Sequence, residues 1–243
     1  MRYKLIVSYD GSNYSGFQVQ KDKDTIQKRL EGALSVVLKD NISIVGCGRT
    51  DAGVSAIESV CHFDVNDEIV VGRTVGYANN ILPTDIRIIS IEKTDEDFHA
   101  RFSAKNKTYE YYFYTGGIVP VYEKFAVNIG YNINIDDMIK GAEMFVGKHD
   151  FSAFCASNTE VKDKVRNIFS SKIIDLNDGL YKFQICGEGF LYNMVRIIMG
   201  TLVSIGRNKI KLTDIKKIIK SKDRSLSGKT MPSKGLYLKK VLY

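Results

Sequence analysis

The chain has 243 residues, of which 44% are hydrophobic and only three are proline. That composition predicts one or two compact domains with an apolar core, packed without a flexible linker. Lys and Arg outnumber Asp and Glu by 35 to 28, and the resulting charge of +7 favours a polyanionic partner such as a nucleic acid.

The four cysteines show no CxxC spacing and the three histidines do not cluster with them, which argues against a zinc site or a disulfide framework. Reduced thiols, together with an N-terminus that lacks a signal-peptide pattern, predict a cytoplasmic protein. The most apolar stretch, residues 189–205, is short for a membrane span and contains Arg196. We therefore expect a buried core helix there and no membrane association.

The first half of the chain predicts alternating strands and helices. Residues 3–9 alternate as a strand does, and a helix begins at Asp24 or Thr25, where Asp24 with Gln27 resembles a capping box. The remaining expected elements are strands at 42–47 and 59–65, a helix at 70–82 that ends before Pro83, and a strand at 86–92. This β-α-β-β-α-β order is the ferredoxin-like motif.

The second half repeats the same order of elements. It predicts a strand at 107–115, a helix at 135–146, strands at 165–175 and 180–187, helices at 190–205 and 213–222, and a strand at 236–242. We therefore expect an α+β fold with two halves, 1–104 and 105–243. Their sheets would join into one mixed, mainly antiparallel sheet with a central cleft for a large ligand.

Asp51 is the first candidate catalytic residue. It stands in the loop Gly48-Arg49-Thr50-Asp51-Ala52-Gly53, directly after an apolar strand. Flanking glycines permit backbone angles that can present polar side chains in a fixed direction. The alternative is a tight turn in which Asp51 caps its own backbone.

Arg196 and Tyr109 are the next candidates. Arg196 lies in a helix that is apolar almost all round, so its guanidinium needs an anionic or multi-acceptor partner, which could be Asp51, a structural ion pair or solvent. Tyr109 shares a strand face with Tyr111 and Phe113, and one tyrosine of this segment could stack on an unpaired base. Periodicity does not say which.

Most of the basic residues are expected on solvated faces. A group near one helix end could contact phosphates: Lys216, Lys217, Lys220, Lys222 and Arg224. The chain has no P-loop, no GxGxxG between a strand and a helix, no HExxH, no nucleophile-elbow serine and no RNP1 signature. These absences favour chemistry without a nucleotide cofactor or a metal.

Five blocks of sequence stand in a recognisable order: YDGSNYSGFQVQ at 9–20, GCGRTDAGVSA at 46–56, FHARFSAKNKTYEYYFY at 98–114, GFLYNMVRIIMG at 189–200 and GLYL at 235–238. In these blocks the chain closely resembles the tRNA pseudouridine synthase A family, and the likeness spans nearly its whole length. The resemblance implies the pseudouridine synthase fold, a tRNA substrate, a homodimer, and no cofactor or metal.

The resemblance also implies roles for four residues. Asp51 would be the catalytic aspartate, Arg49 would help to evict and replace the target nucleotide, and Tyr109 would lie against the target base. Arg196 matches the basic residue that partners the catalytic carboxylate. The family isomerises uridines 38, 39 and 40 of the tRNA anticodon stem-loop.

The chemistry is compatible with a single carboxylate. Uracil leaves C1′ through N1, turns and returns through C5, and the departing anion is delocalised over two carbonyls. The carboxylate could attack C1′ or remove the 2′ proton, and the sequence leaves both routes open. A target within a stem must also be flipped out.

Two residues depart from the family pattern: Ser55 stands where His is usual, and Phe17 where Trp is usual. TMPSKGLYL also differs slightly from the usual form. The departures leave room for a paralogue that acts on other RNA uridines. The rival functions are a non-catalytic RNA-binding protein on the same fold and, with little support, a metal-dependent phosphodiesterase.

Overall fold

A computed structural model describes residues 1–157, 159 and 161–243. Contacts within the chain group these residues into two units. Unit 1 comprises Met1–Lys105 with Tyr237–Tyr243, and unit 2 comprises Asn106–Leu236. The sequence analysis assigns the final strand to the second half, whereas the contacts group Tyr237–Tyr243 with unit 1.

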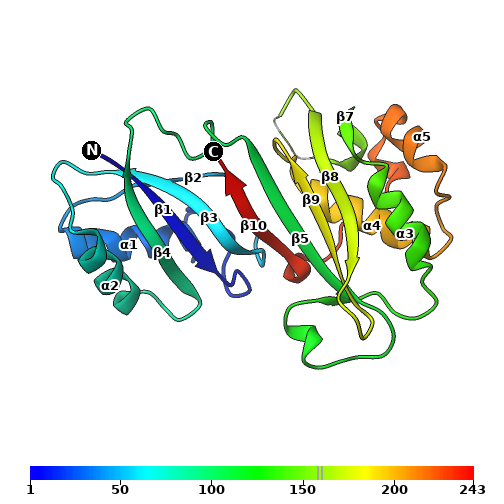
Figure 1. The fold of residues 1–243 in the computed structure, drawn as a ribbon, viewed down its shortest axis with the longest axis horizontal. Helices are drawn as coiled ribbons and strands as arrows, with labels where there is room; N and C mark the ends of the chain where they lie inside the picture. The colour runs from blue at the N-terminus through cyan, green and yellow to red at the C-terminus, as the bar shows by residue number, and fades with distance from the viewer. Residues whose placement is uncertain (158, 160) are drawn as a thin grey trace. The chain divides into compact units, whose positions relative to one another are not determined.

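Unit 1 is a sheet with two helices on one face (Figure 1). Its elements in chain order are β1 (Arg2–Tyr9), α1 (Ile26–Leu38), β2 (Ile44–Gly46), β3 (Ser55–Asp64), α2 (Val71–Ile81), β4 (Ile86–Thr94) and the C-terminal β10 (Leu236–Leu242). The strands run β4-β1-β3-β10, and the short β2 pairs with β3. Strand β3 is antiparallel to β1 and β2 but parallel to β10, so the sheet is mixed.

The antiparallel pairings of the first four strands are those of the ferredoxin-like motif, which confirms the order predicted for this half. Alternate residues of β1 are buried, as the period-2 pattern predicts. Strand β3 begins four residues earlier than expected, at Ser55, and β2 is shorter than expected.

The predicted capping box at α1 is wrong. Thr25 is the N-cap residue, and its side chain accepts a hydrogen bond from the Lys28 amide. Asp24, which precedes the helix, instead forms an ion pair at 2.6 Å with Arg29 of α1.

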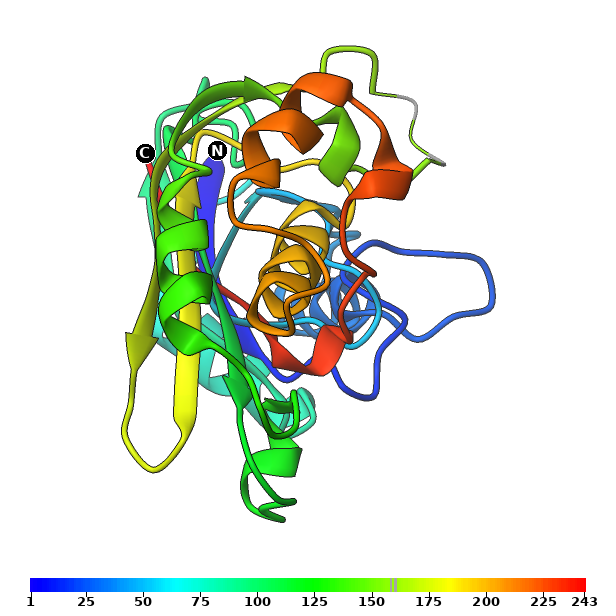
Figure 2. The ribbon, with the colours of Figure 1, turned by 90° about the vertical axis from the view of Figure 1, so that its right-hand side faces the viewer.

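Unit 2 is a second sheet with its helices packed beside it (Figure 2). Its elements are β5 (Asn106–Tyr114), β6 (Val127–Asn128), α3 (Ile135–Glu143), β7 (Gly147–Asp150), β8 (Val165–Asp175), β9 (Leu180–Gly187), α4 (Met194–Gly206) and α5 (Asp214–Ser221). The strands run β5-β9-β8-β7 with antiparallel neighbours, and β6 adds to β5 in parallel. The α+β class is confirmed in both units.

Helix α4 forms the centre of unit 2. Of its 13 residues, 11 are buried, which confirms a core helix in the most apolar stretch of the sequence. Among the described residues, no helix is long and apolar enough to cross a membrane.

Candidate active site

The Asp51 loop connects β2 to β3 in unit 1. The Asp51 carbonyl accepts a hydrogen bond from the Val54 amide at 3.1 Å, and Gly53 has a φ of +76°, in the left-handed region that glycine favours. A backbone hydrogen bond therefore closes the turn. Asp51 is half-buried, whereas Arg49 of the same loop is exposed.

A second loop, residues 10–17, braces the Asp51 loop. The Phe17 amide donates to the Thr50 carbonyl at 3.1 Å, and the Tyr9 and Thr50 hydroxyls are 2.9 Å apart. Gly16 has a φ of +97°, and a Cβ there would lie 2.7 Å from the Thr50 oxygen. Only glycine fits this close approach, so the two glycine-containing motifs of the sequence form one packed structure.

Ser55 and Phe17, the two departures from the family pattern, both support this structure. The Ser55 hydroxyl accepts from the Gly11 amide at 3.1 Å and donates to the Asp10 carboxylate at 3.4 Å. The buried Phe17 ring packs on Gly46, where a Cβ would lie 2.5 Å from the ring. Both residues act here as packing and hydrogen-bonding supports within unit 1.

The sequence analysis missed Tyr9, Thr50 and Ser55 as supporting residues. The signal available in the sequence was a hydroxyl residue within or beside a glycine-rich motif. Such a hydroxyl needs a hydrogen-bond partner when the motif packs and buries it. Thr50 is 7% exposed and Ser55 is 5% exposed.

Tyr109 lies on β5 in unit 2. Its ring meets Phe190 edge to face, with 5.0 Å between the ring centroids. Tyr111 and Phe113, on the same strand face, are fully buried, whereas Tyr109 is only partly buried. Burial thus distinguishes the three aromatic residues of this face, which the periodicity alone could not do.

Arg196 lies in the first turn of α4, a short distance along the chain from Phe190. Its Nε donates to the Met231 carbonyl at 2.7 Å, and one terminal nitrogen donates to the Asn193 side-chain oxygen at 2.7 Å. The Met231 amide in turn donates to the Arg196 carbonyl at 3.3 Å. These contacts fix the guanidinium on the segment that leads into β10.

A buried carboxylate follows Tyr109 in the sequence. Glu110 is 1% exposed and accepts hydrogen bonds from Lys182 at 2.8 Å, Gln184 at 2.9 Å and Tyr112 at 2.8 Å. Burial by itself would raise the pKa of Glu110, but these three donors outweigh it and hold the pKa below its ordinary value. Glu110 therefore remains ionised on the opposite strand face from Tyr109.

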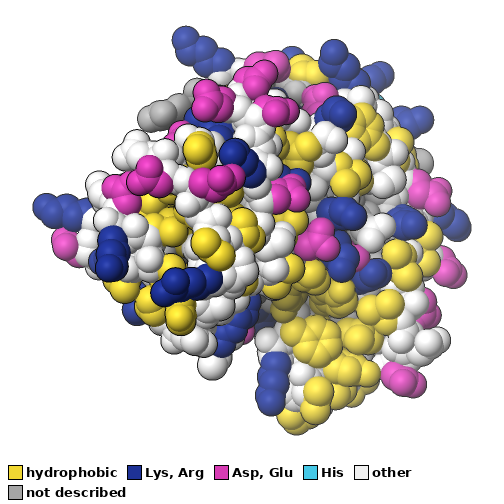
Figure 3. Space-filling model, turned by 60° about the vertical axis from the view of Figure 1, so that its left-hand side comes forward, with side chains coloured by type: hydrophobic (Ala, Val, Ile, Leu, Met, Phe, Trp, Pro, Cys, Tyr) yellow, Lys and Arg dark blue, Asp and Glu magenta, His cyan; other side chains and the backbone are white. Residues whose placement is uncertain are grey.

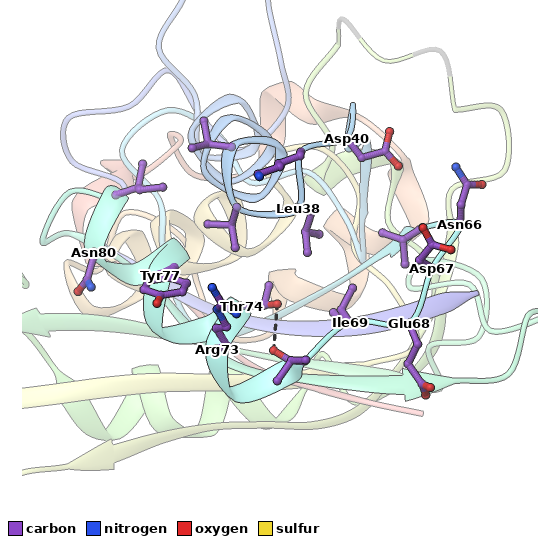
Figure 4. A pocket seen from close by; sticks show the side chains of 16 residues that line it. Leu38, Asp40, Asn66, Asp67, Glu68, Ile69, Arg73, Thr74, Tyr77 and Asn80 are labelled. Atoms are coloured by element: carbon purple, nitrogen blue, oxygen red, sulfur yellow. Dashed lines mark hydrogen bonds between the residues drawn. The ribbon is translucent and has the colours of Figure 1, made fainter.

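A hollow of about 850 Å³ lies in unit 1 between α1, α2 and residues 65–70 (Figure 4). It mixes apolar side chains such as Leu38 and Tyr77 with both acidic and basic ones, including Asp67 and Arg73. None of the four predicted site residues lines it. Within the described part of the chain, no group of three or more His, Cys, Asp or Glu side chains is arranged to hold a metal ion.

Comparison with known proteins identifies the family of this chain. A family model described as tRNA pseudouridine synthase matches residues 5–103 and 142–243. The chain belongs to the tRNA pseudouridine synthase family. The matched residues include Arg49, Asp51 and Arg196, whereas Tyr109 falls between the two matched segments.

Relatives of this tRNA pseudouridine synthase are similar over their full length. A protein named tRNA pseudouridine synthase A from Bacillus subtilis (strain 168) is 45% identical over 100% of this chain and 99% of its own. One of the same name from Ruminiclostridium cellulolyticum is 40% identical, again over 100% and 99% of the two chains. The protein is therefore an isomerase that acts on tRNA.

Among solved structures, a chain of a Cbf5-Nop10-Gar1 complex aligns with 82% of this synthase and 53% of its own length. At 11% identity and a TM-score of 0.37, that likeness adds nothing to the assignment.

Proposed function

We propose that this enzyme isomerises uridines 38, 39 and 40 of the tRNA anticodon stem-loop, as a cytoplasmic homodimer without a cofactor. The proposal is supported by the full-length similarity to proteins named tRNA pseudouridine synthase A and by the five sequence blocks of that family. Neither Ser55 nor Phe17, which depart from the family pattern, is one of the residues proposed for the reaction.

Asp51 is proposed as the catalytic carboxylate. The observation that carries this role is the bracing of its loop, through the Thr50 carbonyl and hydroxyl, by Phe17 and Tyr9. A braced loop holds a reacting group in one geometry and so lowers the entropy lost on reaching the transition state. The aspartate either attacks C1′ or removes the 2′ proton as the C1′–N1 bond breaks.

The remaining steps follow from the balance of the isomerisation. If Asp51 has attacked C1′, its bond to C1′ breaks as the C1′–C5 bond forms; if it has removed the 2′ proton, that proton returns to C2′ as the C1′–C5 bond forms. The proton on C5 then leaves to solvent, and N1 of the turned base gains a proton. The detached base must stay in place meanwhile, and Tyr109 is proposed to hold it by ring contact. Arg49 is proposed to fill the position of the flipped nucleotide, because it is an exposed cation on the same loop as Asp51. Arg196 is proposed to favour the ionised form of Asp51 in the same reaction.

The test uses unmodified tRNA transcripts that carry a uridine at only one of positions 38, 39 and 40, with pseudouridine mapped chemically. We expect the parent to modify all three, and Asp51→Asn to lose at least about a thousandfold in rate. Asp67→Asn, which removes an exposed carboxylate from the same unit, is the matched control and should retain the parent rate.

Two results would contradict the proposal. Modification at other tRNA positions with none at 38–40 would identify a paralogue with another target. An Asp51→Asn variant as fast as the Asp67→Asn control would remove the aspartate from the mechanism. Analytical ultracentrifugation tests the homodimer separately, since the chain mass is 27.4 kDa and a dimer sediments with twice that mass.

A further inference from the structure

A basic hollow of about 370 Å³ lies in unit 2, beside the C-terminal half of α4. The segment from Ser225 to Lys229 forms its other wall, and Figure 2 shows the chain after α5 running along α4. The residues that line it include Gly200, Arg207, Lys209, Ser225, Gly228 and Lys229.

Two glycines fix the wall against the helix. A Cβ on Gly200 would lie 1.8 Å from the Lys229 carbonyl oxygen, and one on Gly228 would lie 2.3 Å from the Gly200 carbonyl carbon. The Gly228 amide also donates to the buried Thr201 hydroxyl at 2.8 Å. The two backbones therefore touch, and no side chain can separate them.

Arg224 holds the same segment through hydrogen bonds. Its guanidinium donates to the Ser227 hydroxyl at 2.9 Å, the Gly228 carbonyl at 3.0 Å and the Thr230 hydroxyl at 3.2 Å. Arg224 is thus a structural support. The hollow that it helps to shape is preformed, so binding there would cost little ordering of the chain.

The charge in the hollow is of one sign. Arg207, Lys209 and Lys229 line it, and none of its lining residues is acidic. One terminal nitrogen of Arg207 donates to the Ile129 carbonyl at 2.7 Å, which orients the guanidinium. Within the described residues, Lys209 and Lys229 form no ion pair, so their charge is available to a ligand.

The basic group that the sequence suggests lies on helix α5 and just after it. Unlike the cations of the hollow, some of its lysines are paired with carboxylates. Lys217 is paired with Asp214 at 2.9 Å and Lys222 with Asp150 at 2.8 Å, leaving Lys216 and Lys220 as its exposed cations without an ion pair in the described chain. On the face shown in Figure 3, Lys and Arg side chains are likewise interspersed with Asp and Glu. A lysine that is already paired with an aspartate releases few counterions from RNA.

We propose that the hollow binds an internucleotide phosphate of the tRNA substrate. This inference rests on the proposed function and adds to it a contact made by none of the four residues assigned to the reaction. Lys209 and Lys229 supply the charge, Arg207 supplies oriented guanidinium donors, and the Ser225 hydroxyl lies on the same wall. Such a contact positions the RNA without reading its sequence.

The test compares two double variants that each remove two positive charges. Lys209→Ala with Lys229→Ala empties the hollow, and Lys216→Ala with Lys220→Ala is the matched control on α5. At about 0.15 M salt each lost phosphate contact lowers affinity roughly fivefold, so the hollow variant, which loses one such contact, should bind tRNA about fivefold or more weakly. The slope of log affinity against log salt should fall by about 1 to 2, with the rate at saturating tRNA unchanged.

The control variant should show much the smaller change, and Lys209→Arg with Lys229→Arg should restore tight binding. Equal losses in the two Ala variants, or parent affinity in the hollow variant, would overturn the inference. A parent protein that leaves tRNA uridines unmodified would refute the proposed function instead. The binding comparison between variants would still decide whether the hollow contacts phosphate.

Discussion

His62 should make unit 1 less stable as the pH falls below neutrality. It is 3% exposed on β3, and its Nδ1 accepts a hydrogen bond from the Ala100 amide at 3.1 Å. Burial, and to a lesser degree the charges of Arg2 and His99, lower the pKa of His62 from 6.5 to about 4. The folded state therefore holds this imidazole neutral, while the unfolded chain takes up a proton.

The size of the effect follows from the two pKa values. Between the folded and unfolded pKa values the unfolded state binds more protons, so stability is lost as the pH falls from about 6.5 toward 4. At about pH 5 the linkage relation gives a loss of about 2 kcal/mol relative to about pH 8. Below the folded pKa the loss no longer grows.

The variant His62→Asn isolates this contribution, because the asparagine side-chain oxygen can accept from Ala100 without titrating. Its free energy of unfolding, followed by circular dichroism in urea, should fall about 2 kcal/mol less than that of the parent between about pH 8 and pH 5. His149→Asn in unit 2 is the control and should follow the parent. The chain has only three histidines, so proton NMR can also titrate His62 directly.

Parallel pH profiles for the parent and His62→Asn would refute the reasoning. A His62 resonance that titrates near its ordinary value would do so independently, since it would show that the imidazole is charged in the folded protein at mildly acidic pH.

Substitutions at three further positions test hydrogen bonding and packing in the two units. Thr50→Val, which removes the hydroxyl facing Tyr9, should lower kcat about tenfold or more with little change in KM, and Thr50→Ser should retain activity; steady-state kinetics on tRNA distinguish them. Gly200→Ala should destabilise the protein by about 3 kcal/mol in urea unfolding, although alanine is the better helix former, because its Cβ would meet the Lys229 backbone. Ser171 has a buried hydroxyl without a hydrogen-bond partner in the described structure, so Ser171→Ala should leave the unfolding free energy unchanged or raise it, and a loss above about 1 kcal/mol would contradict this.

The elements of unit 1 could be predicted because their signals are local. Alternation in β1 and the apolar stripe of α1 depend on neighbouring residues, and the ferredoxin-like order followed from the elements themselves. The partner of β10 is not a local property. Tyr237 pairs with Ser55, and nothing in either short segment specifies a pairing over that separation along the chain.

Capping and close packing were harder to predict for a related reason. Both Asp24 and Thr25 are good N-cap residues, and the choice between them depends on Asp24 having Arg29 as an alternative partner. The sequence around Gly200 gives no reason for a glycine inside a helix, where it is a poor helix former. Its function is visible only when Gly228, on another segment, lies against it.

The sequence argument for Arg196 leaves the partner of its guanidinium open. It holds that a guanidinium in an apolar helix needs an anionic or multi-acceptor partner, which could be Asp51, a structural ion pair or solvent. The structure supplies two neutral acceptors within unit 2, the Met231 carbonyl and the Asn193 side chain, for two of its nitrogens. Neutral acceptors can satisfy buried guanidinium donors, so burial alone does not select a carboxylate. The proposed role of Arg196 in catalysis therefore depends on the family resemblance, and a double-mutant cycle with Asp51 is the measurement that can establish it.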